Sequence, residues 1–170
     1  NLIVTGVEAM FHHINEPLPA LQYECTNSIP FARGMGSSSA AIVSGLVAGS
    51  AISGADLSKE DLTILAADIE GHPDNVAPAI YGGCTVGVRH GSDKWIVDRV
   101  NLPEDLHAVL FVPEMLMNTH ESRAVLPDQI SRSDAVFNIG RAALLVNALS
   151  SGKLQLLKYA TDDRLHQPHR

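Results

Sequence analysis

The feature that most constrains this chain is a Gly/Ser-rich segment that runs directly into a long apolar stretch. Residues 33–39 read RGMGSSS, and residues 40–52 carry apolar side chains on nearly every side of a helical projection. A stretch that is apolar all round predicts a buried helix, which Gly54 then ends. Gly34 and Gly36 let the backbone turn tightly and approach a ligand. The serines lie beside the first N–H groups of the helix, which lack intrahelical partners, so this junction predicts an anion site suited to phosphate.

Other Gly-rich loops fit these residues less well. A P-loop requires Lys followed by Ser or Thr after its last Gly, and this loop contains no Lys. The dinucleotide fingerprint requires a third Gly where Ser39 stands, and a nucleophile elbow requires a Gly two residues after its serine. A flexible linker capped by a serine is the remaining alternative, and it would not need a buried helix directly behind it.

The charge balance and the cysteine count exclude several classes of protein. Twelve Lys and Arg against nineteen Asp and Glu give a net charge of −7, which argues against a nucleic-acid partner but not against a small anionic ligand. Cys25 and Cys84 are too few for a disulfide framework, so we expect a reducing, cytoplasmic setting. The stretch 40–55 is too short and too interrupted to cross a membrane. The chain starts with Asn1 instead of Met, so we expect it to be a piece of a longer protein.

The order of the expected elements favours an α+β fold over a doubly wound sheet. Hydrophobic periodicity and turn signals predict helices over 2–14, 40–52, 75–80, 121–126 and 133–149 and strands over 21–27, 84–89, 95–100 and 107–112. A further helix starts at Ser58, with Asp61 completing a capping box. In the last long helix we expect the following apolar side chains to face the core: Ala135, Val136, Ile139, Ala143, Leu144 and Val146. Pro103 marks the expected domain boundary, which gives domains over 1–102 and 103–170.

Three further segments carry polar side chains in suggestive groups. Glu70 ends a helix beside a Gly/Pro turn, and His72, Asp74 and Asn75 crowd the loop that follows. His72 and Asp74 could be metal ligands, but the chain does not visibly supply the further ligands that a transition metal needs. Glu70 could instead be a solvated surface charge. Residues 119–127 read THESRAVLP, where Arg123 is either a clamp for an anion or a surface arginine. Residues 163–170 read DRLHQPHR, and the other histidines fit surface positions.

The Gly/Ser-rich segment resembles the phosphate-binding motif of the GHMP kinases, P-x-x-x-G-L-G-S-S-A-A. Met35 replaces the Leu of that motif and Ser39 replaces an Ala. The resemblance implies that the nucleotide phosphates of ATP are bound by the following residues: Pro30, Arg33, Gly34, Met35, Gly36, Ser37, Ser38, Ser39 and Ala40.

The segment after Glu70 is similar to the H-x-D-N-x-A-P-A-x-x-G-G stretch of homoserine kinases within that family. Other GHMP kinases commonly carry an Asp, as catalytic base, where this chain has Asn75. The resemblance therefore implies base-free phosphoryl transfer at Asp74 and Asn75, with Asp74 positioning the attacking hydroxyl. The resemblance further implies that His72 and Asp74 bind the substrate. It also implies that Ser38 and Glu70 hold Mg²⁺, a cation that favours oxygen ligands.

The two remaining segments resemble the T-x-x-A-R-x-x-L-P and D-x-x-H-Q-P-Y-R elements of homoserine kinases. Ser122 stands where the first element has Ala, and His169 stands where the second has Tyr. The resemblance implies that Thr119, Arg123 and Arg170 bind the substrate, with the two guanidinium groups on its carboxylate.

Taken together, these resemblances imply conversion of ATP and L-homoserine to ADP and O-phospho-L-homoserine, a step toward threonine. They also imply an N-terminal domain like the second domain of ribosomal protein S5, followed by part of a ferredoxin-like domain. The family's first and last motifs would lie before Asn1 and after Arg170, so we expect the isolated chain to be a poor catalyst. The resemblance is compatible with a homodimer, and no nucleic acid or membrane is expected as a partner.

Three alternatives stay open at this point. The chain could derive from another GHMP kinase that acts on a carboxylate-bearing alcohol such as mevalonate. It could be a nucleotide-binding remnant without turnover. A serine hydrolase that uses Ser38 is the most distant alternative.

Overall fold

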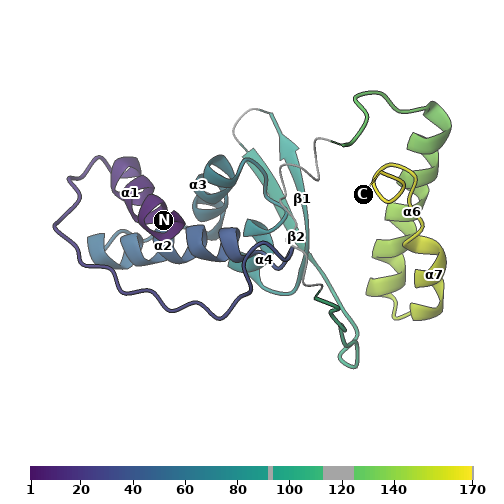
Figure 1. Ribbon diagram of the computed structural model, residues 1–170, viewed down its shortest axis with the longest axis horizontal. Coiled ribbons are helices and arrows are strands. Elements are labelled where there is room, and N and C mark those ends of the chain that lie inside the picture. The colour runs from purple at the N-terminus through teal and green to yellow at the C-terminus, as the bar shows by residue number, and fades with distance from the viewer. Residues whose placement is uncertain (92–93, 113–124, 170) are drawn as a thin grey trace. The chain divides into compact units, whose positions relative to one another are not determined.

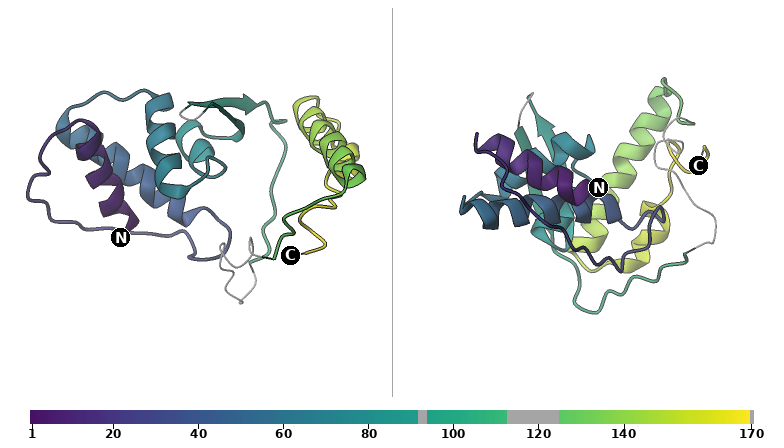
Figure 2. Two further views of the ribbon diagram at one scale, coloured as in Figure 1. Left: turned by 90° about the horizontal axis from the view of Figure 1, so that it is seen from above. Right: turned by 60° about the vertical axis from the view of Figure 1, so that its left-hand side comes forward.

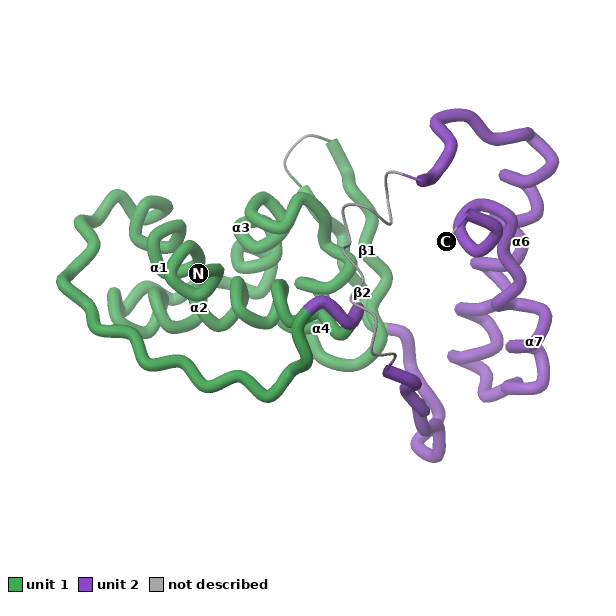
Figure 3. Tube along the Cα trace, viewed as in Figure 1, with its two compact units in different colours: residues 1–31, 35–99 green, residues 32–34, 100–170 purple. Residues whose placement is uncertain are grey.

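The computed structural model describes residues 1–91, 94–112 and 125–169. In chain order the elements are α1 (Leu2–His13), α2 (Ser37–Ser53), α3 (Lys59–Glu70), α4 (Val76–Tyr81), β1 (Cys84–His90), β2 (Lys94–Val100), α6 (Arg132–Ser150), the 3-10 turn η1 (Leu154–Leu156) and α7 (Leu157–Ala160) (Figure 1). Two compact units divide the chain: residues 1–31 with 35–99, and residues 32–34 with 100–170 (Figure 3). None of the described helices is long and apolar enough to cross a membrane.

Helices α1 and α2 cross at glycines that bring their backbones together (Figures 1 and 2). A Cβ atom added to Gly45 would lie 2.1 Å from the carbonyl oxygen of Ile3, and one added to Gly6 would lie 2.5 Å from that of Ile42. A Cβ on Gly49 would lie 2.8 Å from Cβ of Met10. In the sequence these glycines interrupt an apolar run. In the fold they allow a contact that no larger residue permits.

The core of the first unit forms where α1 and α2 meet α3 and α4. Its buried apolar side chains that cluster together are Met10, Ile42, Val43, Leu46, Ala66, Ala67 and Val76. Helix α2 supplies three of these, which confirms its predicted burial on that side. On its other side Val47 and Ile52 are about half exposed, so the prediction of burial all round was wrong.

Local signals mark the ends of several helices. The side chain of Asn1 accepts a hydrogen bond from N–H of Ile3 at the start of α1, and Ser58 and Asp61 form the predicted capping box at the start of α3. Gly54 ends α2 in a left-handed conformation with φ 72°. Helix α2 begins at Ser37, three residues earlier than expected, so the three serines form its first turn instead of a loop.

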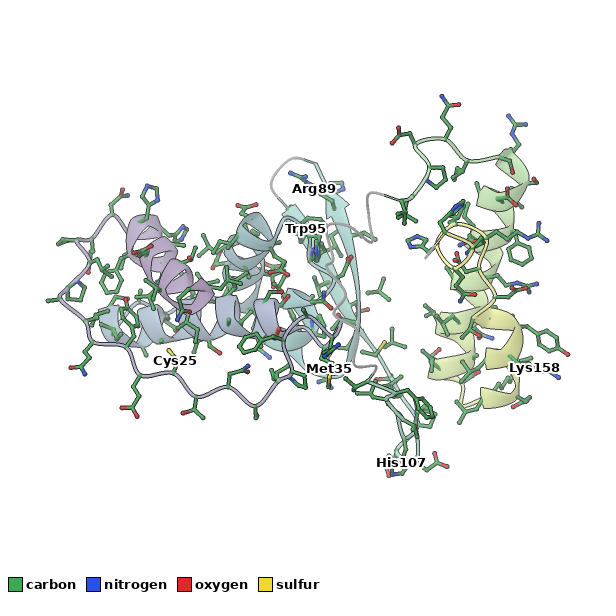
Figure 4. All side chains as sticks on the ribbon, in the orientation of Figure 1. Cys25, Met35, Arg89, Trp95, His107 and Lys158 are labelled. Carbon is green, nitrogen blue, oxygen red and sulfur yellow. The ribbon has the colours of Figure 1, made fainter. Side chains whose placement is uncertain are left out.

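Strands β1 and β2 pair as a two-stranded sheet close to their predicted bounds. The Arg89 guanidinium of β1 lies over the Trp95 ring of β2, 5.6 Å from its centroid, which is a cation–π contact between the two strands (Figure 4). Helix α4, which precedes β1, packs against it.

Two predicted strands are absent from the structure. Residues 21–27 and 107–112 have no strand conformation and pair with no described strand. The alternation in 21–27 and the apolar run in 107–112 are both typical of strands, but the backbone groups of a strand still need a neighbouring strand. Neither segment finds one among the described residues, and Val109, Leu110 and Phe111 are 77%, 66% and 91% exposed.

The second unit is built on α6, which confirms the helix predicted over 133–149. The Ser131 hydroxyl caps it by accepting from the Asp134 N–H, and the helix packs against η1 and α7. The prediction that Val136, Ile139 and Val146 face inward was wrong, because they are 64%, 69% and 41% exposed. The opposite side of α6, with Phe137 and Asn138, contacts the C-terminal segment instead. The helix predicted over 121–126 lies largely outside the described residues.

Candidate functional site

The first turn of α2 offers free backbone donors next to a tight loop. Gly36 is the residue before the helix, adopts φ 70°, and cannot cap the helix because it has no side chain. Its carbonyl accepts from the N–H of Ala40, so the N–H groups of Ser37, Ser38 and Ser39 precede the first intrahelical bond. These donors lie at the positive end of a 17-residue helix, as an anion site requires.

The loop before the helix, from Pro30 to Met35, bends twice through left-handed backbone. Ala32 has φ 53° and Gly34 has φ 70°, and Met35 at the end of the loop is about one third exposed. Alanine seldom adopts such a φ, so the loop holds Ala32 in a strained conformation.

Ser38 and Glu70, the two residues expected to hold Mg²⁺, come together across 32 residues of sequence. The Ser38 hydroxyl donates a 2.7 Å hydrogen bond to Oε1 of Glu70, and the pair is partly buried. Neighbouring oxygen ligands of an octahedral Mg²⁺ ion lie about 3 Å apart, so these two oxygens fit one edge of its coordination shell. Among the described residues no group of three or more His, Cys, Asp or Glu could hold a metal ion. Two protein oxygens supplemented by phosphate oxygens are the arrangement that Mg²⁺ commonly takes with nucleotides.

The segment after Glu70 lies against the same end of α2. A Cβ atom added to Gly36 would lie 4.0 Å from Cβ of Asn75, which places the start of the helix next to this loop. Gly71 ends α3 with φ 86°, and Pro73 is buried. The fold therefore joins the two predicted segments, 36–39 and 70–75, into one site within the first unit.

Within this loop His72 and Asp74 face each other. Nδ1 of His72 lies 3.9 Å from Oδ2 of Asp74, and their side chains are 15% and 69% exposed. The exposed carboxylate of Asp74 is accessible to a ligand, while the imidazole of His72 lies mostly beneath the surface. The sequence alone did not predict this pairing.

Ser39 differs from its neighbours because its side chain is fully buried. Its hydroxyl oxygen has no hydrogen-bond partner, although Ser39 lies in the first turn of α2. Ser37 and Ser38 are half-buried. A buried unsatisfied hydroxyl normally destabilises the fold, and an Ala at this position would avoid that cost.

The segment that leads to Arg170 is held by Asp163 in the second unit. The Asp163 carboxylate accepts from the N–H groups of Leu165, His166 and Gln167 at 3.1, 2.7 and 2.6 Å, and from the side-chain amide of Asn138. Desolvation raises the pKa of Asp163, but these hydrogen bonds outweigh it and hold that pKa well below its usual range. The local hydrogen bonds of Asp163 follow a recognisable pattern, an Asp at the start of a turn. No sequence pattern predicts its contact with Asn138, which lies 25 residues away.

Three predicted substrate residues, Thr119, Arg123 and Arg170, lie outside the described residues. The structure therefore brings together the predicted phosphate loop, the Ser38–Glu70 pair and the 72–75 loop. The proposed carboxylate clamp stays a prediction.

Comparison with known proteins shows what the chain is similar to. Residues 1–83 match the family model of the GHMP kinases N terminal domain. The whole chain is 42% identical to a homoserine kinase from Synechococcus sp. and 44% identical to one from Moorella thermoacetica, and it spans 56% and 57% of their lengths. The chain is thus similar to the GHMP kinases over residues 1–83 and to homoserine kinases over its whole length.

A solved structure extends this likeness to the fold. A crystal structure of homoserine kinase from Cytophaga hutchinsonii superposes with a TM-score of 0.84 at 28% identity, covering 100% of this chain and 55% of that one. The α+β fold of the GHMP kinases is thereby confirmed for this chain. The chain spans slightly more than half the length of the relatives that it matches.

Proposed function

We propose that the protein transfers the γ-phosphoryl group of ATP to the side-chain hydroxyl of L-homoserine. The observation that carries the proposal is the bond between Ser38 and Glu70 beside the open first turn of α2, with Asn75 next to Gly36. Relatives named homoserine kinase align with the entire chain at about 40% identity, which supports this substrate over other alcohols.

In this proposal the chain acts mainly by placing groups and by stabilising charge, as phosphoryl transfer requires. The N–H groups at the start of α2 bind the nucleotide phosphates, and Ser38 and Glu70 would hold Mg²⁺, which neutralises phosphate charge when bound. Asp74 orients the substrate hydroxyl. The oxygen of the substrate hydroxyl forms a bond to the γ-phosphorus as the bond between that phosphorus and ADP breaks. Because the Asn75 amide cannot accept a proton, the hydroxyl proton goes to the transferred phosphate or to solvent.

A substrate panel tests the proposal directly. ADP release is measured at one ATP concentration with L-homoserine or mevalonate, using the 170-residue chain and any longer natural polypeptide that contains it. We expect homoserine-dependent ADP release, weak for the 170-residue chain. Faster turnover with mevalonate would assign the protein to another GHMP activity. Tight ADP–Mg²⁺ binding without turnover of either alcohol would indicate a nucleotide-binding remnant.

Mutation of the proposed cation ligand tests the nucleotide site by itself. Glu70→Gln keeps the side-chain size but removes the charge, and we expect about a tenfold weaker affinity for ADP–Mg²⁺ in calorimetry. Glu60→Gln is the matched control, because Glu60 is exposed in the first turn of the same helix. Equal affinities of the two variants would remove Glu70 from the site.

We further propose a cytoplasmic setting and a homodimer for this protein. The setting is supported by Cys25 and Cys84, which are both free, since cytosolic thiols are kept reduced. Sedimentation of the same preparation measures the state of assembly.

A further inference from the structure

His72 carries a buried nitrogen that makes no hydrogen bond. Among the described residues three buried side-chain polar atoms lack a partner: Oγ of Ser39, Nδ1 of His72 and Nε of Arg141. A buried polar atom without a partner costs free energy, so its retention calls for an explanation. The atom of His72 lies in the candidate site, between Glu70 and Asn75 in sequence.

One candidate partner for this nitrogen is the carboxylate of Asp74. The 3.9 Å separation between Nδ1 and Oδ2 exceeds hydrogen-bond distance by about 1 Å. A neutral imidazole places a proton on one ring nitrogen and a lone pair on the other. A lone pair on Nδ1 would repel the carboxylate, so this environment favours the proton on Nδ1, pointing toward Asp74.

The loop is built so that Asp74 can move while His72 stays in place. Pro73, between the two, is buried and its ring lies 3.6 Å from the position of a Cβ on Gly87 in β1. The Pro73 carbonyl also accepts a 2.8 Å hydrogen bond from N–H of Ala77. The His72 ring is 15% exposed, whereas the Asp74 side chain is 69% exposed and can rotate. The exposed carboxylate of Asp74 is therefore the partner with room to approach Nδ1.

We propose that His72 is a positioning residue: its Nδ1–H donates to the Asp74 carboxylate and fixes that carboxylate for the attacking hydroxyl. This inference rests on the proposed function for the identity of the hydroxyl, but the His72–Asp74 pair itself does not. His72 then acts through Asp74 instead of contacting the substrate directly, which departs from the expectation for this residue.

The ring nitrogens of His72 report the pair without any need for turnover. In nitrogen NMR of the 170-residue chain at pH 8, we expect His72 as the Nδ1–H form, and we expect Asp74→Ala to shift it toward Nε2–H. His13, which is exposed on α1, is the internal control and keeps its signals in the variant. An Nε2–H form in the unmodified chain, or no response to Asp74→Ala, would overturn the inference.

Two matched amide substitutions then separate positioning from substrate contact. Asn places its amide N–H near the position of Nδ1, whereas Gln places it near Nε2. We expect His72→Gln to lower kcat about tenfold with little change in KM for either substrate, and His72→Asn to restore most of kcat. A raised KM for homoserine in both variants would instead indicate direct contact and contradict the inference. Absence of homoserine turnover in the unmodified protein would refute the proposed function, while the NMR result still decides on the pair.

Discussion

At the scale of single residues, one buried hydroxyl makes no hydrogen bond. Ser39 is fully buried in the first turn of α2 and its Oγ has no partner. We expect Ser39→Ala to raise the free energy of unfolding by about 1 kcal/mol more than the control Ser44→Ala does. Ser44 is exposed on the same helix, so it reports the gain in helix propensity alone. Chemical denaturation measures both, and a loss of stability in Ser39→Ala would mean that the hydroxyl has a partner.

Asp163 gives the second unit a defined dependence on pH. Its folded-state pKa is lower than its unfolded value, so its contribution to stability is present above the unfolded pKa of about 4 and is lost as pH falls below it. Asp163→Asn keeps the size and removes the titration. We expect the stability difference between the two proteins to be constant above about pH 5 and to shrink toward pH 3. Denaturation at several pH values measures this, and a constant difference down to pH 3 would contradict it.

At the scale of elements, the close crossing of α1 and α2 predicts that a larger residue in place of a glycine there destabilises the fold. A Cβ at Gly45 would meet the backbone carbonyl of Ile3 at 2.1 Å, where no side chain can move aside. We expect Gly45→Ala to lower the free energy of unfolding by about 2–3 kcal/mol.

Gly140 provides the control for that substitution. It lies in α6 with no atom within 4 Å of an added Cβ, so Gly140→Ala should stabilise the chain by about 0.5–1 kcal/mol through helix propensity alone. Thermal or chemical unfolding measures both variants. Equal effects of the two substitutions would show that the helices do not approach as closely as described.

The elements also show why some features were predictable from the sequence. Caps at Ser58 and Gly54 act within a few residues, so helix boundaries could be derived locally. The strands expected over 21–27 and 107–112 failed because pairing depends on a neighbour that no local pattern supplies. In the site, the Ser38–Glu70 pair was found through its resemblance to a family motif. The His72–Asp74 and Asn138–Asp163 contacts depend on tertiary geometry and were missed.

At the scale of the whole molecule, net charge and exposed apolar surface act in opposite directions. The net charge of −7 makes copies of the chain repel one another, whereas the apolar side chains of segment 109–111 favour contact. Salt screens the repulsion, so we expect self-association to increase with ionic strength in sedimentation velocity. Phe111→Ser should reduce it, while Val88→Ser, an exposed position on the paired strand β1, should change it less. A monomer at every salt concentration would contradict this expectation.

Because α2 contacts α1 at the glycine crossing, a small tilt of α2 there moves its distant first turn. Gly45 and Ser37 are eight residues apart on one helix, which is about 12 Å along its axis. A tilt of about 5° at the crossing would therefore displace the proposed phosphate-binding end by about 1 Å, and a misplacement of that size can slow a reaction about a hundredfold. Substitutions on α1, which lies outside the proposed nucleotide site, would then change how accurately the first turn of α2 is positioned.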